Sequence, residues 1–212
     1  MPGLLLTGLA VNALLGSLMA TLQVLLLQDW QASRAIIAWG FGTLDDRSFF
    51  HIVVVWVGAL VALAGIPFVA LELDLLAGGE EDAAALGADP ARIKTMVLAC
   101  VALATAASVS VSGQIAFVGL LVPHVMRQLV GPHHRRLLPA AFLAGATLLL
   151  LVVVFQHALC PLAAEWFADG SPKLALVCRR VTAMQPGALT SLLGAPFFLS
   201  LLLKQGRKIA EV

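Results

Sequence analysis

The chain has 212 residues, of which 60% are apolar and only 12% carry a formal charge, and its net charge is +1. Soluble domains carry about a quarter charged residues, so this composition, with a mean hydropathy of +0.97, excludes an ordinary soluble domain. It indicates an integral membrane protein. The near-neutral charge gives no support to a nucleic-acid partner or an acidic substrate.

The first predicted membrane-spanning helix covers residues 4–28, which carry no charged side chain. This run exceeds the roughly 20 residues that a helix needs to cross a bilayer, and a signal peptide would have a basic leader and a shorter apolar core. Five further apolar runs follow, over residues 50–71, 95–111, 115–130, 138–155 and 187–203. They are apolar on all sides, which in lipid favours helices. We predict one all-α domain over residues 1–212, a six-helix transmembrane bundle.

Six spans place both termini on the same side of the membrane. If that side is the cytoplasm, eight of the 13 Lys and Arg residues lie inside and five outside, which the positive-inside rule favours. The inner group is Arg92, Lys94, Arg127, Arg135, Arg136, Lys204, Arg207 and Lys208, and the outer group is Arg34, Arg47, Lys173, Arg179 and Arg180. We therefore predict a multi-pass protein with both termini in the cytoplasm.

The third span carries small residues at spacings of four, such as Cys100, Ala104 and Ser108. Such a face allows two helices to approach closely inside a membrane.

The sequence contains no obvious source of energy for active transport. Its carboxylates lie at span ends or in loops, whereas a proton-driven carrier would place an acid within the membrane. No G-x-x-x-x-G-K-[ST] motif for binding ATP phosphates occurs. If the protein transports actively, the motor must be another polypeptide.

The loop after the second span predicts a short surface helix. Three acids follow Gly79, namely Glu80, Glu81 and Asp82, and the helix macrodipole favours acids in a first turn. Gly87 is a natural helix stop. Asp89-Pro90 then caps a new helix. The alternative is an ordinary solvated acidic loop.

A long motif follows the third span. It runs as Gly113-x-Ile-x-Phe117-Val-Gly119-Leu-x-Val-Pro123-His124, then Arg127, and ends in the basic turn His-Arg-Arg-Leu-Leu-Pro over residues 134–139. This run resembles the permease family (FecCD-type) of bacterial ABC importers for iron-siderophore, haem and cobalamin. Residues 9–15, the Trp39, Gly42 and Leu44 segment and residues 186–198 also resemble that family. The resemblance places the protein in the bacterial inner membrane.

The resemblance assigns roles to further residues. The coupling segment, which in the family docks on the cytoplasmic ATPase, is matched by Gly79, Glu80, Glu81, Ala83, Leu86 and Gly87. The translocation path is matched by Asn12, Gly187, Thr190, Gly194 and Pro196.

The resemblance also implies partners. It implies an ABC ATPase dimer that binds ATP and Mg, a periplasmic or lipid-anchored substrate-binding protein, a second permease copy in a homodimer, and membrane lipid. This chain itself would hold no cofactor or metal and catalyse no covalent reaction. The function implied is that of the transmembrane permease subunit of an importer for such a metal chelate.

The chain departs from the family in two places. Family members have about ten spans, and the matches here begin at the fifth, so we expect this form alone not to support uptake. The alternative is a truncated, non-transporting membrane scaffold or remnant, and a membrane enzyme is the weakest reading. The family also has a D-x-x-x-R pattern at the end of the helix that corresponds to the fifth predicted span of this chain. Here Val153 and His157 stand at the positions of the Asp and the Arg.

The second departure continues into an outer insert over residues 158–185. Arg179 and Arg180 could replace the missing arginine of that pattern as the dock for the substrate-binding protein, or they could anchor the chain at the membrane surface. Cys160 and Cys178 fall in the same insert and could pair as a disulfide, whereas Cys100 is read as a packing residue. His124, His133 and His134 lack the spacing of a metal site, so we interpret them as structural.

Overall fold

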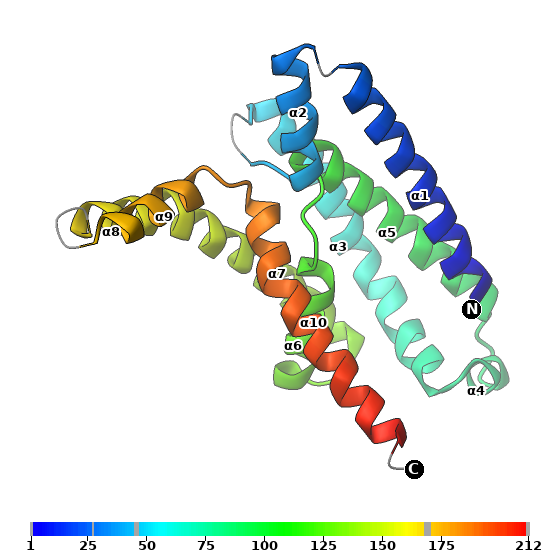
Figure 1. Ribbon diagram of the computed structural model, residues 1–212. Helices are drawn as coiled ribbons and strands as arrows, with labels where there is room; N and C mark the ends of the chain where they lie inside the picture. Colours follow the sequence, from blue (N-terminus) through cyan, green and yellow to red (C-terminus); the bar gives the residue numbers. More distant parts are fainter. Residues whose placement is uncertain (1, 27, 45–46, 168–170, 211–212) are drawn as a thin grey trace. The chain divides into compact units, whose positions relative to one another are not determined.

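The computed structural model describes residues 2–26, 28–44, 47–167 and 171–210, and all regular structure in these ranges is helical. The chain forms two compact units, residues 1–40 and 41–212, which are treated separately below. Figure 1 shows the helices in chain order. Their bounds are α1 Pro2–Leu25, α2 Trp30–Phe41, α3 Phe49–Gly78, α4 Glu80–Ala85, α5 Pro90–Ser112, α6 Val118–Val130, α7 His134–Val154, the π-helix η1 Phe155–Leu159, α8 Cys160–Trp166, α9 Pro172–Thr182 and α10 Pro186–Ala210.

The first unit holds α1 and nearly all of α2. The side-chain carboxylate of Asp29 begins α2, because its Oδ1 accepts hydrogen bonds from the backbone N–H groups of Gln31 at 3.0 Å and Ala32 at 3.1 Å. This is the usual N-terminal cap. On α1, Leu9 and Leu14 are each 66% exposed. An apolar helix with so little cover inside its own unit is suited to lipid or to protein packing in the membrane.

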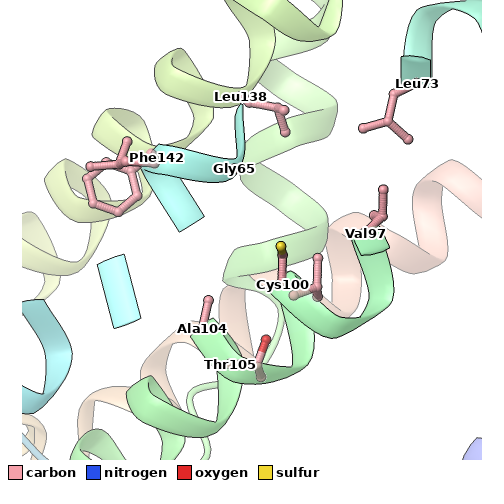
Figure 2. Close-up of a pocket in the computed structure, with 10 residues that line it drawn as sticks. Gly65, Leu73, Val97, Cys100, Ala104, Thr105, Leu138 and Phe142 are labelled. Atoms are coloured by element: carbon pink, nitrogen blue, oxygen red, sulfur yellow. The ribbon is translucent and has the colours of Figure 1, made fainter. Parts of the chain in front are cut away.

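The second unit is built around the pair α3 and α5. A Cβ placed on Gly58 of α3 would lie 2.6 Å from Cβ of Ala107 on α5, and one on Gly65 would lie 3.5 Å from Sγ of Cys100. The small side chains of α5 therefore let the two helices approach closely, as the sequence predicted for Cys100 and Ala104. Cys100 and Ala104 also line an apolar cavity of about 250 Å³ between α3, α5 and α7 (Figure 2).

The chain leaves the helical conformation between α5 and α6. Gly113 has φ +70° and Phe117 has φ +66°, and the residues between them are not helical. The expected span over 115–130 is therefore shorter in the structure, because α6 begins only at Val118. Its 13 residues cover about 20 Å at 1.5 Å per residue, less than the ~30 Å hydrocarbon core.

Three of the helices described here are long and apolar enough to cross a membrane: Leu6–Leu25, Pro90–Ser112 and the continuous helix His134–Trp166. The count rises to four if the bent halves Phe49–Gly65 and Ala70–Gly78 of α3 form one span. Val118–Val130 and Pro186–Leu201 are shorter apolar helices. These lie at the six predicted positions. The side chains of Lys204, Arg207 and Lys208, used in the charge count, lie outside the described residues.

The described residues of the outer insert are largely helical and form an arm of α8 and α9. The two helices pack against each other, and Figure 1 shows them side by side, away from α3 and α5. The side chain of Gln156, which is fully buried, holds the C-terminal end of α9 against η1, at the base of the arm. Its Nε2 donates to the carbonyl of Met184 at 2.7 Å and to that of Val181 at 3.4 Å.

Candidate functional site

The predicted coupling segment forms a short helix with defined ends. α4 covers Glu80–Ala85, and its first turn contains the three acids Glu80, Glu81 and Asp82, next to the partial positive charge of the helix N-terminus. Gly79, at φ +135°, links α4 to the end of α3. α4 packs against both α3 and α5. Ala83 is fully buried by this packing, so α4 is attached on one face and open on the other.

The end of α4 is closed by a Schellman turn. The N–H of Ala88 donates to the carbonyl of Ala83 at 3.0 Å, and that of Gly87 donates to the carbonyl of Ala84 at 3.0 Å. Gly87 has φ +88°, a conformation that glycine adopts without a steric penalty. This closed turn presents Leu86 to the surface, where its side chain is 73% exposed.

An ion pair joins α4 to α5. Nζ of Lys94 lies 2.6 Å from Oε1 of Glu80, and the hydrogen bond and charge of Lys94 lower the pKa of the Glu80 carboxyl. Asp89 fixes the start of α5, because its Oδ1 accepts from Ala91 N at 3.0 Å and Arg92 N at 3.2 Å. This confirms the predicted Asp89-Pro90 cap. Exposed ion pairs contribute little to stability, so the pair serves chiefly to orient α4.

A second contact ties the end of α3 to the start of α7. Oδ1 of Asp74 accepts a hydrogen bond from the backbone N–H of His134 at 3.0 Å and lies 2.6 Å from Nδ1 of the same residue. His133 Nδ1 lies 3.8 Å from Asp74 Oδ2. Asp74 thus caps a helix 60 residues away in sequence. Its position four residues before the end of α3 places this tie next to the coupling segment.

At the other end of α5, glycines hold the non-helical segment 113–117 close to α10. A Cβ on Gly187 would lie 2.9 Å from the carbonyl oxygen of Gln114 and against that of Phe41, and one on Gly42 would lie 2.7 Å from Cγ1 of Ile115. Only residues without a side chain fit these approaches. We call Gly42, Gly187, Gly194 and the segment 113–117 the glycine junction.

Phe117 packs directly on Gly194 within the glycine junction. Any Cβ on Gly194 would overlap the side chain of Phe117. One turn further along α10, the ring of Phe197 meets that of His124 edge to face, with 6.0 Å between centroids. Residues of the long sequence motif therefore pack on residues of the predicted translocation path, a pairing that the sequence did not indicate.

The two sites lie at opposite ends of α5. That helix begins at Pro90, beside α4, and ends at Ser112, beside the glycine junction, where the Ser112 carbonyl accepts from Thr43 N at 2.8 Å. Its 23 residues span about 35 Å. One continuous helix therefore connects the surroundings of α4 with the glycine junction.

The structure places the remaining predicted residues as follows. Thr190 is buried in α10, with its Oγ1 donating to the Gly187 carbonyl at 3.0 Å. Pro123 lies inside α6 and Pro196 inside α10, while Gly119, Arg127, Arg179 and Arg180 are exposed. Asn12 is exposed on α1, in the first unit. Cys160 and Cys178 are both free thiols, so the structure does not contain the disulfide that these two residues could form.

The sequence did not reveal that four side chains join different helices to one another, namely those of Asp74, His134, Lys94 and Gln156. Nothing local in the sequence pairs Asp74 with His134 or Glu80 with Lys94. Gln156 did offer a signal, since it is a polar residue at the end of a long apolar run, and such residues are expensive in a membrane unless they have partners.

Comparison with known proteins gives consistent matches. The FecCD transport family matches residues 2–165. The chain is 40% identical over 205 residues to the cobalamin import system permease protein BtuC of Halobacterium salinarum, covering 94% of this chain and 47% of that protein. It is 36% identical over 205 residues to the hemin transport system permease protein HmuU of Yersinia pestis, covering 95% and 54%. The chain thus spans about half the length of these curated relatives.

A solved structure shows the same fold. It is described as an inward-facing conformation of a metal-chelate type ABC transporter, with a TM-score of 0.73 and 28% sequence identity. The match covers 94% of this chain and 58% of that chain.

Proposed function

Because the chain belongs to the FecCD transport family, we propose that it forms the membrane permease part of an ATP-driven importer for a metal chelate of the iron-siderophore, haem or cobalamin class. The names of its relatives, which refer to cobalamin and hemin, support this substrate class. Its apolar helices make it a multi-pass membrane protein. ATP and Mg would bind to a partner ATPase dimer, and this chain would catalyse no covalent step.

The observation that carries this proposal is the attachment of α4. The helix is fixed to α5 by the Glu80–Lys94 pair and to α3 through Gly79, while Leu86 stays exposed. An ATPase that binds Leu86 and the acids Glu81 and Asp82 would pull on both α3 and α5. The Asp74–His134 tie would carry the same displacement to α7.

The glycine junction supports a path-forming role for α10. Because Gly187 and Gly194 have no side chains, the backbone of Gln114 and the side chain of Phe117 lie directly against α10, so a small tilt of α5 would shift α10. We propose that two copies of the permease enclose the path, and that ATP binding alternates it between inward-facing and outward-facing states. A substrate-binding protein would deliver the chelate on the outer side.

The distribution of positive charge supports the proposed orientation. Arg92 and Lys94 begin α5, and Arg135 and Arg136 begin α7, at the end of the second unit where α4 lies. By the positive-inside rule, this end would face the cytoplasm. We propose that the protein resides in the inner, or plasma, membrane with both termini in the cytoplasm.

Uptake by cells tests the proposal. Deletion of the gene segment that encodes this chain should abolish energy-dependent accumulation of one labelled chelate among ferric siderophore, haem and cobalamin. Reinsertion of the wild-type segment at its own locus should restore it, and so should reinsertion of a variant carrying Glu165→Lys, an exposed acid on α8. A variant carrying Glu80→Lys and Glu81→Lys should reach the membrane but fail to restore uptake. Unchanged accumulation of all three chelates after deletion would contradict the proposal.

A further inference from the structure

One face of α9 combines cations with exposed apolar side chains. Lys173, Leu176, Val177 and Arg180 follow the spacing i, i+3, i+4, i+7 and so lie along one stripe of the helix. Leu176 is 52% exposed and Val177 54% exposed, and both cations are exposed. Ala175, on the opposite side, is buried. We call these four residues the α9 stripe.

The cations of the α9 stripe have no charged partner within the described part of the chain. The ion pairs found there join Lys94 to Glu80 and the histidines 133 and 134 to Asp74. A helix face exposed to water alone would be polar throughout. Two apolar side chains between two long cationic ones are instead typical of a helix lying at a membrane surface, where the cations reach phosphate and the apolar groups reach hydrocarbon.

The position of α9 agrees with that environment. The continuous helix His134–Trp166 has 33 residues, whereas about 20 suffice to cross the hydrocarbon core. Counted from His134, about 20 residues reach the end of α7, so η1 begins near the membrane boundary. Gln156 in η1 holds the carbonyls of Val181 and Met184. The C-terminal end of α9, with Arg180, would therefore lie level with the lipid headgroups.

From this geometry we propose that the α9 stripe binds the bilayer surface, with Lys173 and Arg180 on phospholipid phosphates and Leu176 and Val177 against the upper acyl chains. A bilayer surface offers both chemistries within one layer. The carboxylates of a docked protein would satisfy the cations alone and leave the apolar pair without a matching surface. The stripe belongs to a helix that follows the part matched by the family, residues 2–165, and anionic lipid should strengthen the contact.

Electron paramagnetic resonance tests the proposal. A nitroxide is placed on Val177→Cys in a variant lacking the three native cysteines, in vesicles of phosphatidylcholine with or without phosphatidylglycerol. The label should become shielded from a water-soluble nickel reagent, and more accessible to oxygen, when phosphatidylglycerol is present. Each cation removed, by Lys173→Gln or Arg180→Gln, should lower the ratio of surface-bound to free states about fivefold. Arg135→Gln with Arg136→Gln, which removes two exposed cations from the start of α7, should change nothing.

A second measurement needs no label. Hydrogen exchange of peptides covering residues 172–182 in the wild-type protein should slow when phosphatidylglycerol is added, and Lys173→Gln with Arg180→Gln should remove that slowing. The proposal is overturned if exchange and nickel accessibility are the same in both lipid mixtures. It is also overturned if protection appears only when the substrate-binding protein is added, since the stripe would then be a protein dock.

Discussion

Asp74 and His134, which are 60 positions apart in sequence, form a helix cap between two different helices. Asp74 Oδ1 accepts from the His134 backbone N–H at 3.0 Å and lies 2.6 Å from its Nδ1. The first N–H groups of a helix have no partner within the helix, and His133, at the cap position of α7, supplies none from its side chain. Asp74 therefore both completes α7 and fixes the end of α3 beside α4.

Removal of this cap should destabilise the protein and also weaken coupling. Asp74→Ala should cost about 1 kcal/mol, as is typical for a lost N-terminal cap. Asp74→Asn keeps an acceptor for the His134 N–H and should retain most of the stability. Thermal unfolding in detergent gives the stability of each variant. An alanine variant as stable as the wild type would show that the contact does not contribute to the stability of the folded protein.

The packing of Phe117 on Gly194 predicts a specific rescue. Gly194→Ala introduces a Cβ that overlaps Phe117, and overpacking of this kind typically costs about 1–3 kcal/mol. Phe117→Gly removes the obstructing side chain and also suits the φ of +66° at that position. The double variant should therefore be more stable than Gly194→Ala alone.

Gly119→Ala is the matched control, because a Cβ there meets nothing within 4 Å and alanine favours the helix. It should not lower the melting temperature. If Phe117→Gly fails to improve the Gly194→Ala variant, the close contact in the glycine junction is not the source of the destabilisation.

Attachment of α4 to α5 should depend on pH. The pKa of Glu80 is lowered in the folded state by Lys94, so the stabilising pair is fully present above the unfolded-state pKa of Glu80 and is lost as pH falls through the lowered value. A spin label on Ala84→Cys, an exposed position on α4, should therefore become more mobile at acid pH. In Glu80→Gln the label should be mobile at every pH. Equal mobility of the label at all pH values in both backgrounds would exclude the pair as the attachment.

Labelling of single cysteines from either side of the membrane tests the topology. Ala84 and Ser171 are both exposed and lie in the segments predicted to be cytoplasmic and external. Cysteines at these positions, in a variant without native cysteines, should react with a membrane-impermeant reagent from opposite sides. A cysteine at the neighbouring position Ala83 would not be labelled efficiently, because that residue is fully buried. Reaction of both from one side would exclude the proposed arrangement of spans.

Local signals in the sequence predicted the long apolar helices and the caps around α4 well, whereas α2, α8 and α9 were not predicted as helices. Asp89-Pro90 and Gly87 mark helix ends through chemistry that acts within a few residues, and the structure has both ends where those residues indicate. The start of α6 was harder to predict from the sequence. Phe117 has a left-handed backbone conformation that phenylalanine does not itself favour, and its side chain packs against α10. Since nothing in the local sequence marks this break, residues 115–130 look like one apolar run.

Pairings between distant elements were beyond the sequence. In the sequence Asp74 is one of several carboxylates at span ends or in loops, and its partner His134 is one of three histidines interpreted as structural. The tie exists because α3 and α7 pack against each other, which no pattern in either segment specifies. The resemblance to the permease family supplied the role of α4, whereas the structure supplied the contacts through which that role would act.

Cross-linking of Leu86 to the cognate ATPase is the most direct test of the proposed coupling. Leu86→Cys places a thiol at the exposed residue that caps the C-terminal end of α4, and Leu162→Cys, on an exposed position of α8, is the control at the opposite end of the second unit. A thiol cross-linker applied to membranes containing both proteins should capture the ATPase at position 86 and not at position 162, and charge reversal at Glu80 and Glu81 should reduce the yield. Capture at both positions alike, or only at position 162, would contradict the role of α4 as the coupling segment.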